Sequence, residues 1–215
     1  MSKWKITWSK RLIIGLCIAF LLLVIDFVTK WVVEKNVALN QSIAVIPNFF
    51  YISKSYNIAI AFSLGSQLGV WGRVINIMIS VVMSLVIFGY WLTHDHKFNN
   101  WERAIAAMLG AGAVGNLIDR AFYWEETTGF NGVIDFLQFY LGGGPNANPG
   151  FFNPFATFNF ADACLTIGIV TLIVYMIVDM IKNRDRSLET DPRLEQKPEP
   201  IEKKEEEPTS SEEGE

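Results

Sequence analysis

The sequence predicts an all-α polytopic membrane protein with four transmembrane helices and a small extracytoplasmic β-rich surface element. Hydrophobic residues make up 51% of the chain, and most of them are gathered in long runs. Each run is close to the roughly 20 residues that an α-helix needs to cross the hydrocarbon core of a bilayer. The predicted spans are 12–33, 74–92, 104–123 and 163–181. A shorter aromatic segment between the first two runs predicts the surface element.

The charge pattern separates a tail from the rest of the chain. The formal net charge is −4, but residues 182–215 alone carry 7 Lys and Arg against 12 Asp and Glu. This last stretch also contains Pro and few aliphatic residues, which is typical of disorder. We therefore predict a membrane domain over 1–182 and a disordered, charged cytoplasmic tail over 183–215. Nothing in this charge distribution suggests nucleic-acid binding.

The Lys and Arg residues of the connecting segments predict the orientation in the membrane. Four precede the first span, two lie between the second and third spans, and three follow the fourth span closely. The segment 124–161 carries none. Because positively charged loops remain on the cytoplasmic side, both termini are predicted to be cytoplasmic and the two longer loops to lie outside.

Polar residues within the spans are costly in a bilayer and often mark a functional site. In this sequence they gather toward the ends of the spans that are predicted to face outward. They are Asp26, Lys30, Asn116, Asp119, Arg120, Asn159 and Asp162. The sequence therefore predicts one polar site near the outer surface, to which three of the four helices contribute.

Spacing indicates which of these side chains share a helix face. Asp26 and Lys30 are four residues apart, as are Asn116 and Arg120, while Asp119 is three residues after Asn116. The Asp26–Lys30 pair could be a purely structural ion pair, and Arg120 could simply extend to the outer headgroups.

A stripe of small residues precedes these polar groups in the third span. Ala107, Ala111 and Gly115 recur at intervals of four residues. In a lipid environment, such a stripe allows a neighbouring helix to approach closely. We therefore expect the third span to be central in the bundle.

The two outer loops carry different signals. Residues 48–56 are rich in aromatic and β-branched side chains and predict a strand at the membrane surface, with Asn57 next to it. The second loop contains Asp135 within the apolar tetrapeptide Val-Ile-Asp-Phe. It also contains the Gly-, Pro- and Asn-rich segment 142–150, which predicts an irregular flap.

Asp135 and Asp162 suggest a specific chemistry. Two carboxyl groups that meet in a poorly solvated site cannot easily both be ionised, so one keeps a proton near neutral pH. Such a pair can activate a water molecule between its members. We therefore interpret the chain as an intramembrane aspartic peptidase, with Asp135 and Asp162 as the catalytic residues.

Five ordered motifs make the chain resemble the lipoprotein signal peptidases, also called signal peptidase II or prolipoprotein signal peptidases. The motifs are Asp26-x-x-x-Lys30, the segment 57–62 (Asn-Ile-Ala-Ile-Ala-Phe), the segment 112–120 (Gly-Ala-Val-Gly-Asn-Leu-Ile-Asp-Arg), the segment 133–136, and the segment 158–162 (Phe-Asn-Phe-Ala-Asp). The resemblance covers about residues 10–182. Ala59 and Ala111 stand where the family usually has Gly, and the connection from Asp135 to Asn159 is longer than is usual for the family.

The resemblance implies an activity and assigns roles to residues. The family removes the signal peptide of bacterial prolipoproteins before the diacylglyceryl-modified cysteine, in the cytoplasmic (inner) membrane, with the active site facing outward. Globomycin-type compounds inhibit it, and neither a metal nor another cofactor is implied. The implied catalytic residues are Asp135 and Asp162. Asn57, Asn116, Arg120 and Asn159 would bind substrate, and Asp26, Lys30 and Asp119 would support the site.

Several alternatives follow from other residues. A small ion- or proton-translocating transporter subunit would use the buried charges as a relay, but it would also place some in the cytoplasmic half of the membrane. A Ser/Lys peptidase would need Ser63 and Lys30, although Lys30 has a nearer partner in Asp26. His94 and His96 lack the spacing of a zinc peptidase motif.

The two cysteines do not indicate redox chemistry. Cys17 and Cys164 are far apart in the sequence and form no C-x-x-C motif. We expect both to be small buried hydrophobic residues.

Overall fold

The computed structural model describes residues 6, 8–57, 70–122, 124–125, 129–130, 132–148, 150 and 153–189. The chain forms two compact units, Met1–Ile173 and Val174–Glu215. The part of the 57–62 motif after Asn57, including Ala59, lies outside the described residues, as do Ser63 and residues 190–215 of the predicted tail.

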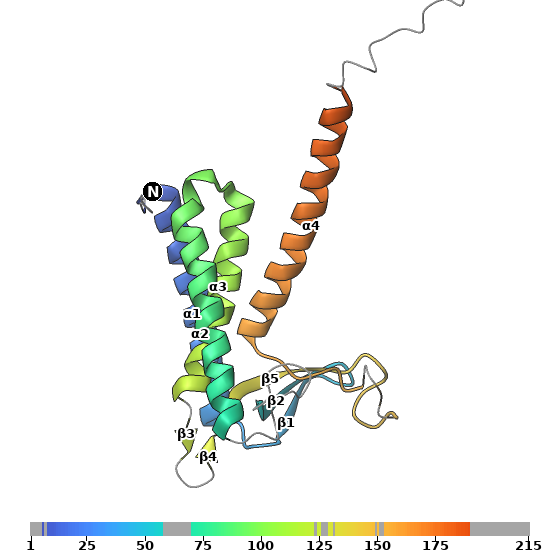
Figure 1. Cartoon of the computed structure of the whole chain (residues 1–215). Coiled ribbons are helices and arrows are strands. Elements are labelled where there is room, and N and C mark those ends of the chain that lie inside the picture. The colour runs from blue at the N-terminus through green and yellow to red at the C-terminus, as the bar shows by residue number, and fades with distance from the viewer. Residues whose placement is uncertain are drawn as a thin grey trace, which may run out of the picture. The chain divides into compact units, whose positions relative to one another are not determined.

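Within the described part of the chain, four helices are long and apolar enough to cross a membrane, which confirms the predicted class. They are α1 (Lys10–Asn36), α2 (Val70–His94), α3 (Asn100–Phe122) and α4 (Phe160–Glu189). A single 3₁₀ turn, η2 (Asp95–Lys97), connects α2 to α3. Helices α1, α2 and α3 lie side by side (Figure 1). Each helix begins before the apolar run that predicted it, and all except α3 also end after that run.

Helix α3 is the central helix of this bundle, as its small residues predicted. Over its most apolar window, 56% of α3 is buried, against 22% for α1 and 22% for α2. A Cβ atom on Gly112 would lie 2.6 Å from the carbonyl oxygen of Ala161, and one on Gly110 would lie 2.8 Å from the ring of Phe88. Glycines on different sides of α3 therefore let α4 and α2 pack closely against it.

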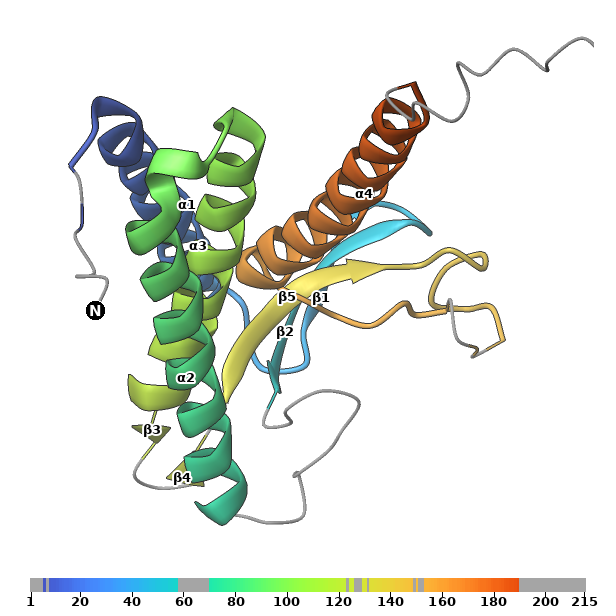
Figure 2. The same cartoon turned by 45° about the horizontal axis from the view of Figure 1, so that its top comes forward.

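The predicted surface element is a three-stranded antiparallel sheet in the order β1-β2-β5. Its strands are β1 (Ser42–Ile46), β2 (Phe50–Asn57) and β5 (Val133–Phe139). Strand β5 lies against the carboxyl-terminal ends of α1 and α3 (Figure 2). Val33 and Val37 pack there with Ile134 and Phe136 in one hydrophobic cluster. This packing fixes the sheet to the end of the helix bundle. A second, two-stranded ribbon pairs β3 (Trp124–Glu125) with β4 (Gly129–Phe130).

The segment after β5 is irregular, as predicted for 142–150. Among its described residues, strand pairing is limited to two isolated bridges, one between Gly150 and Asn153 and one between Phe158 and Leu137 of β5. Gly144 has a φ of +90°, and a Cβ there would lie 2.6 Å from the side chain of Asn48, so the turn needs glycine. The chain then returns along β5, where the carbonyl of Phe158 accepts hydrogen bonds from Phe136 N and Leu137 N. This return brings residue 159 and the start of α4 next to β5.

Two sequence predictions need correction. The disordered tail was predicted from residue 183, but α4 continues to Glu189. Residues 182–189 contain good helix formers, and Pro192 is the next residue that disfavours a helix before it. Cys17 was predicted to be buried, but it is exposed on α1, whereas Cys164 is buried as predicted. The exposed side of a membrane helix faces lipid, which also accepts a small apolar thiol.

Candidate functional site

Lys30 is the centre of a buried charge cluster between α1 and α3. Its ammonium nitrogen lies 2.8 Å from Asp26 Oδ2 and 2.9 Å from Asp119 Oδ2. All three residues are at most 2% exposed. Buried charges are tolerated only when they are closely paired and hydrogen-bonded. The predicted Asp26–Lys30 pair is therefore confirmed, and Asp119 extends it to a second helix.

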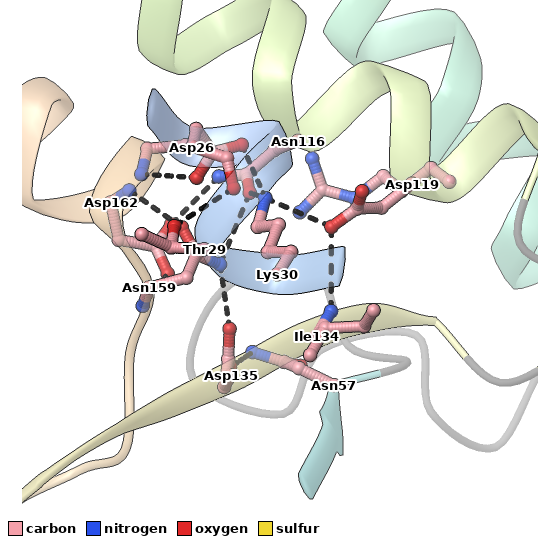
Figure 3. A network of polar contacts seen from close by, with 12 residues as sticks. Asp26, Thr29, Lys30, Asn57, Asn116, Asp119, Ile134, Asp135, Asn159 and Asp162 are labelled. Carbon is pink, nitrogen blue, oxygen red and sulfur yellow. Dashed lines mark hydrogen bonds and ion pairs between the residues drawn. The ribbon is translucent and has the colours of Figure 1, made fainter. Parts of the chain in front are cut away.

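Asn116 links this cluster to Asp162. Lys30 Nζ donates to Asn116 Oδ1 at 3.3 Å, and Asn116 Nδ2 donates to Asp162 Oδ1 at 2.7 Å (Figure 3). An ammonium group can only donate, so the oxygen of the Asn116 amide must face Lys30. The NH₂ group of the same amide is then left to face Asp162. The buried charge thus determines which group Asp162 contacts.

Asn159 and Asp162 form a capping box at the start of α4. The Asn159 side chain accepts a hydrogen bond from Asp162 N at 2.9 Å, and Asp162 Oδ2 accepts one from Asn159 N at 3.3 Å. This reciprocal pair satisfies backbone groups that a helix leaves unpaired at its first turn. The hydrogen bonds that cap α4 therefore also fix the positions of the Asn159 and Asp162 side chains.

Asp26 caps the same helix from a distance of 135 residues along the chain. Its Oδ1 atom accepts a hydrogen bond from Ala161 N at 2.8 Å. Asp26 and Asp162 thus both place a carboxyl group at the amino-terminal end of α4, where the helix dipole favours negative charge. A Cβ atom on Gly115 would lie 2.6 Å from Asp26 Oδ2, so the glycine makes room for this carboxylate.

Asp135 reaches the site from strand β5. Ile134 and Phe136 pack into the hydrophobic cluster with Val33 and Val37. Successive side chains of a strand point to opposite faces, so Asp135 points away from that cluster. It is nevertheless only 3% exposed. Because side chains alternate in direction along β5, the Asp135 carboxyl group lies in a poorly solvated position on the other face of the strand.

Two amides hold the Asp135 carboxyl group. Asn57 Nδ2 donates to Oδ2 at 3.0 Å, and Asn159 Nδ2 donates to Oδ1 at 2.7 Å. Burial, and after it the negative charge of Asp162, raise the pKa of Asp135 from its ordinary value to about 7. The two hydrogen bonds act in the opposite direction, because they favour the ionised form. Asp135 can therefore hold or release a proton near neutral pH.

Asn159 joins the two predicted catalytic carboxyl groups. One end of its side-chain amide donates to Asp135, and the other end accepts from the backbone of Asp162 (Figure 3). Of the nine predicted site residues, all except Arg120 are connected by these hydrogen bonds and ion pairs. The network combines four carboxyl groups, three amides and one buried ammonium group. This composition can exchange protons with a bound water and position a polar substrate backbone.

Arg120 lies beside this network and makes a different contact. Its Nη1 atom donates to Ser80 Oγ on α2 at 2.9 Å. Arg120 and Asn116 form the polar end of a groove of about 260 Å³ between α2, α3 and the first turns of α4. Asn76 and Ser80 of α2 also line the groove, and apolar side chains such as Met83 and Ile169 form the rest of its wall. The groove is suited to an apolar ligand with a polar end.

Helix α2 contributes two polar side chains to this groove that were not predicted from the sequence, Asn76 and Ser80. Together with Ser84, which does not line the groove, they recur at intervals of four residues, and all three are buried. A polar stripe at helical spacing within an apolar run was the signal that could have revealed this contribution.

A second buried polar cluster lies at the other end of the bundle, and its charged residues, Asp95 and Arg103, fall outside the predicted spans. Asp95, in η2, accepts hydrogen bonds from Arg103 Nε at 2.8 Å, Trp91 Nε1 at 3.2 Å and Ser9 Oγ at 3.1 Å. Ser9 also caps α1 by accepting from Leu12 N. Through the hydrogen bond between Ser9 and Asp95, the cluster links the start of α1 to the connection between α2 and α3. The contact between Ser9 and Asp95 was not predicted, because nothing in the sequence near Asp95 indicates the distant Ser9.

Comparison with known proteins places this site in a family. The sequence profile described as signal peptidase (SPase) II matches residues 18–178. The lipoprotein signal peptidase of Bacillus pumilus (strain SAFR-032) is 33% identical over 168 residues, which cover 78% of this chain and 95% of the relative. The enzyme of the same name from Cyanothece sp. (strain PCC 7425 / ATCC 29141) is 38% identical over 160 residues, covering 73% of this chain and 79% of the relative.

Solved structures agree with this assignment. A structure described as a bacterial membrane enzyme superimposes with a TM-score of 0.60 at 26% sequence identity, covering 77% of this chain and 88% of that one. Another of the same description gives a TM-score of 0.58 at 26% identity, covering 75% and 91%. These matches support the predicted peptidase, and they give no support to the transporter alternative. The chain belongs to the signal peptidase II family.

Proposed function

We propose that this chain is an aspartic endopeptidase that removes signal peptides from diacylglyceryl-modified prolipoproteins at the outer face of the bacterial cytoplasmic membrane. The observation that supports this most directly is the position of Asn159, whose amide contacts Asp135 at 2.7 Å and the backbone of Asp162 at 2.9 Å. Two acids from different elements are thereby held by a single side chain.

In the proposed reaction, the two acids share one proton. The ionised carboxylate takes a proton from a water molecule, whose oxygen attacks the carbonyl carbon of the bond before the modified cysteine. The protonated carboxyl group then gives its proton to the leaving amine as the carbon–nitrogen bond breaks. A pKa of about 7 for Asp135 suits a group that must exist in both forms near neutral pH.

The amides give the reaction its geometry. Asn57 and Asn159 hold the Asp135 carboxyl group, and Asn116 holds that of Asp162. Asn116 and Arg120 also stand at the polar end of the groove, where they would position the substrate backbone or the developing oxyanion. The apolar part of the substrate would occupy the remaining length of this groove. Asp26, Lys30 and Asp119 would support these groups without contacting the substrate.

The proposed function is tested by cleavage of a defined substrate. The purified full chain is incubated in detergent with a diacylglyceryl-modified prolipoprotein, and the product masses are measured. We expect one cut, immediately before the modified cysteine, and inhibition by globomycin. The same prolipoprotein without the diacylglyceryl group is the control and should remain uncut. A cut at another bond, equal cleavage of the control, or no cleavage would contradict the proposal.

A further inference from the structure

A second groove lies at the opposite end of the helix bundle from Asp135. It has a volume of about 360 Å³ and lies between the amino-terminal parts of α1 and α3. Its α1 wall consists of Arg11, Ile14, Gly15 and Ile18. These residues are spaced at i, i+3, i+4 and i+7, so they share one helix face. One cationic residue therefore stands at the end of an apolar strip that runs into the membrane-spanning part of α1.

The α3 wall of the groove is arranged like the α1 wall, with polar and cationic residues at the mouth and a small apolar residue after them. Asn100 and Arg103 stand in the first turn of α3, and Ala104 follows them. The Asn99 side chain accepts a hydrogen bond from the backbone N of Glu102 and so caps this helix end, while Glu102 returns a hydrogen bond to Asn99 N. The lining therefore contains two arginines and no acidic residue. A groove with a cationic mouth and apolar walls results.

The two arginines of the lining differ in burial and in their pairing with acidic residues. Arg103 is 7% exposed and donates to Asp95 through Nε and Nη2. Its remaining nitrogen, Nη1, is buried and has no hydrogen-bond partner among the described residues. Arg11 is exposed and makes no ion pair within the described part of the chain. The charge of Arg11, which no described carboxylate neutralises, therefore favours an anionic ligand at the mouth of the groove.

We propose that this groove binds an anionic phospholipid, with its phosphate at Arg11, Asn100 and Arg103 and an acyl chain along Ile14, Gly15 and Ile18. Arginine pairs well with phosphate oxygens, and basic pockets between transmembrane helices bind anionic headgroups. A free phosphate would satisfy the arginines but leave the apolar strip uncovered, so the groove as a whole fits a lipid. The charge distribution places this end of the bundle on the cytoplasmic side, where anionic lipids are available.

The test uses a matched pair of neutralising variants. Arg11→Gln removes a charge that lines the groove, while Lys10→Gln removes the neighbouring exposed charge, which does not line it. Neither residue makes an ion pair within the described chain, so both variants should fold. The full chain is purified in a neutral detergent, stripped of lipid, and titrated with phosphatidylglycerol or phosphatidylcholine while native mass spectrometry measures the bound lipid. A third titration uses inorganic phosphate, and thermal stability is recorded alongside.

We expect one phosphatidylglycerol to bind more tightly than phosphatidylcholine. Arg11→Gln should weaken its binding about fivefold, and Lys10→Gln should leave it unchanged. Ala104→Phe, whose ring would occupy the apolar part of the groove, should also weaken the binding of phosphatidylglycerol. Equal losses in the two neutralising variants, equal binding of phosphatidylcholine, or stabilisation by inorganic phosphate as large as that by the lipid would overturn the proposal. Because the readout is binding, its outcome does not depend on the proposed catalytic mechanism.

Discussion

At the level of single residues, the carboxyl group of Asp135 and the ammonium group of Lys30 are both buried, but they have different kinds of partner. Lys30 contacts Asp26, Asp119 and Asn116, and no described contact joins it to Asp135 directly. Asp135 instead has neutral amides as partners. Lys30 is therefore paired within the supporting cluster, and its charge reaches Asp135 only over a longer distance, where it favours the ionised form. The proton of Asp135 remains available for chemistry.

The raised pKa of Asp135 leads to a prediction about pH. A carboxyl group with a pKa of about 7 loses its proton as pH rises through that value, and the pair then has no proton to share. We expect kcat/KM for prolipoprotein cleavage to fall as pH increases above about 7. The measurement is a pH–rate profile of the purified enzyme. A rate that stays constant well into the alkaline range would contradict the assignment of the proton to this pair.

Replacing Lys30 tests the buried cluster. Lys30→Met leaves two carboxylates, Asp26 and Asp119, without their shared cation. Breaking a buried ion pair typically costs about 3–5 kcal/mol. We expect a large drop in the midpoint of thermal unfolding in detergent, together with loss of activity. The matched control is Lys35→Met, which removes an exposed lysine from the last turn of the same helix. Equal unfolding midpoints for the two variants would contradict the structural role of Lys30.

At the level of elements, the crossing of α3 and α4 determines where Asp162 lies. Gly112 allows Ala161 and Leu165 to approach α3, and Gly115 makes room for the Asp26 carboxylate. The first turn of α4 is in turn held by hydrogen bonds that its backbone N–H groups donate to the side chains of Asp26 and Asn159. The position of the catalytic acid thus depends on backbone packing as well as on its own hydrogen bonds.

A methyl group at this crossing should be harmful. In Gly112→Ala, the new Cβ would lie 2.6 Å from both Ala161 O and Leu165 Cγ, so the helices would have to separate. Overpacking of this kind typically costs about 1–3 kcal/mol. We expect lower thermal stability and lower cleavage activity. Gly89→Ala is the control, because nothing lies within 4 Å of the Cβ position there. Equal thermal stability and activity of Gly112→Ala and Gly89→Ala would contradict the close approach of α4 to α3.

At the level of the whole molecule, the local parts of the architecture could be predicted and the long-range contacts could not. The four apolar runs predicted four helices, and the four-residue spacing of Asp26 and Lys30 predicted their ion pair. The hydrogen bond from Ala161 N to Asp26 could not be predicted, because it joins backbone and side chain across 135 residues. The contact of Ser9 with Asp95 was missed for the same reason. Such contacts depend on how the helices pack, which periodicity does not specify.

The predicted orientation in the membrane can be tested with single cysteines. In a background with Cys17 and Cys164 replaced by Ala, Asn146→Cys places a thiol in the exposed segment after β5, and Lys97→Cys places one in the connection between α2 and α3. We expect a membrane-impermeant maleimide to label Asn146→Cys in intact spheroplasts. It should label Lys97→Cys only after the membrane is permeabilised, because positively charged loops remain in the cytoplasm. The opposite labelling pattern would contradict the orientation.

The most direct measurement of the catalytic proposal is the cleavage rate of three variants: Asp135→Asn, Asp162→Asn, and the double variant. If both acids act on one water, each single change should lower kcat by at least about 100-fold. The double variant should be little slower than the slower single variant, because residues that act as a unit have non-additive effects. Asp179→Asn, which alters an exposed acid far along α4, should leave the rate unchanged. A single variant at Asp135 or Asp162 that folds normally and cleaves at nearly the wild-type rate would contradict the account.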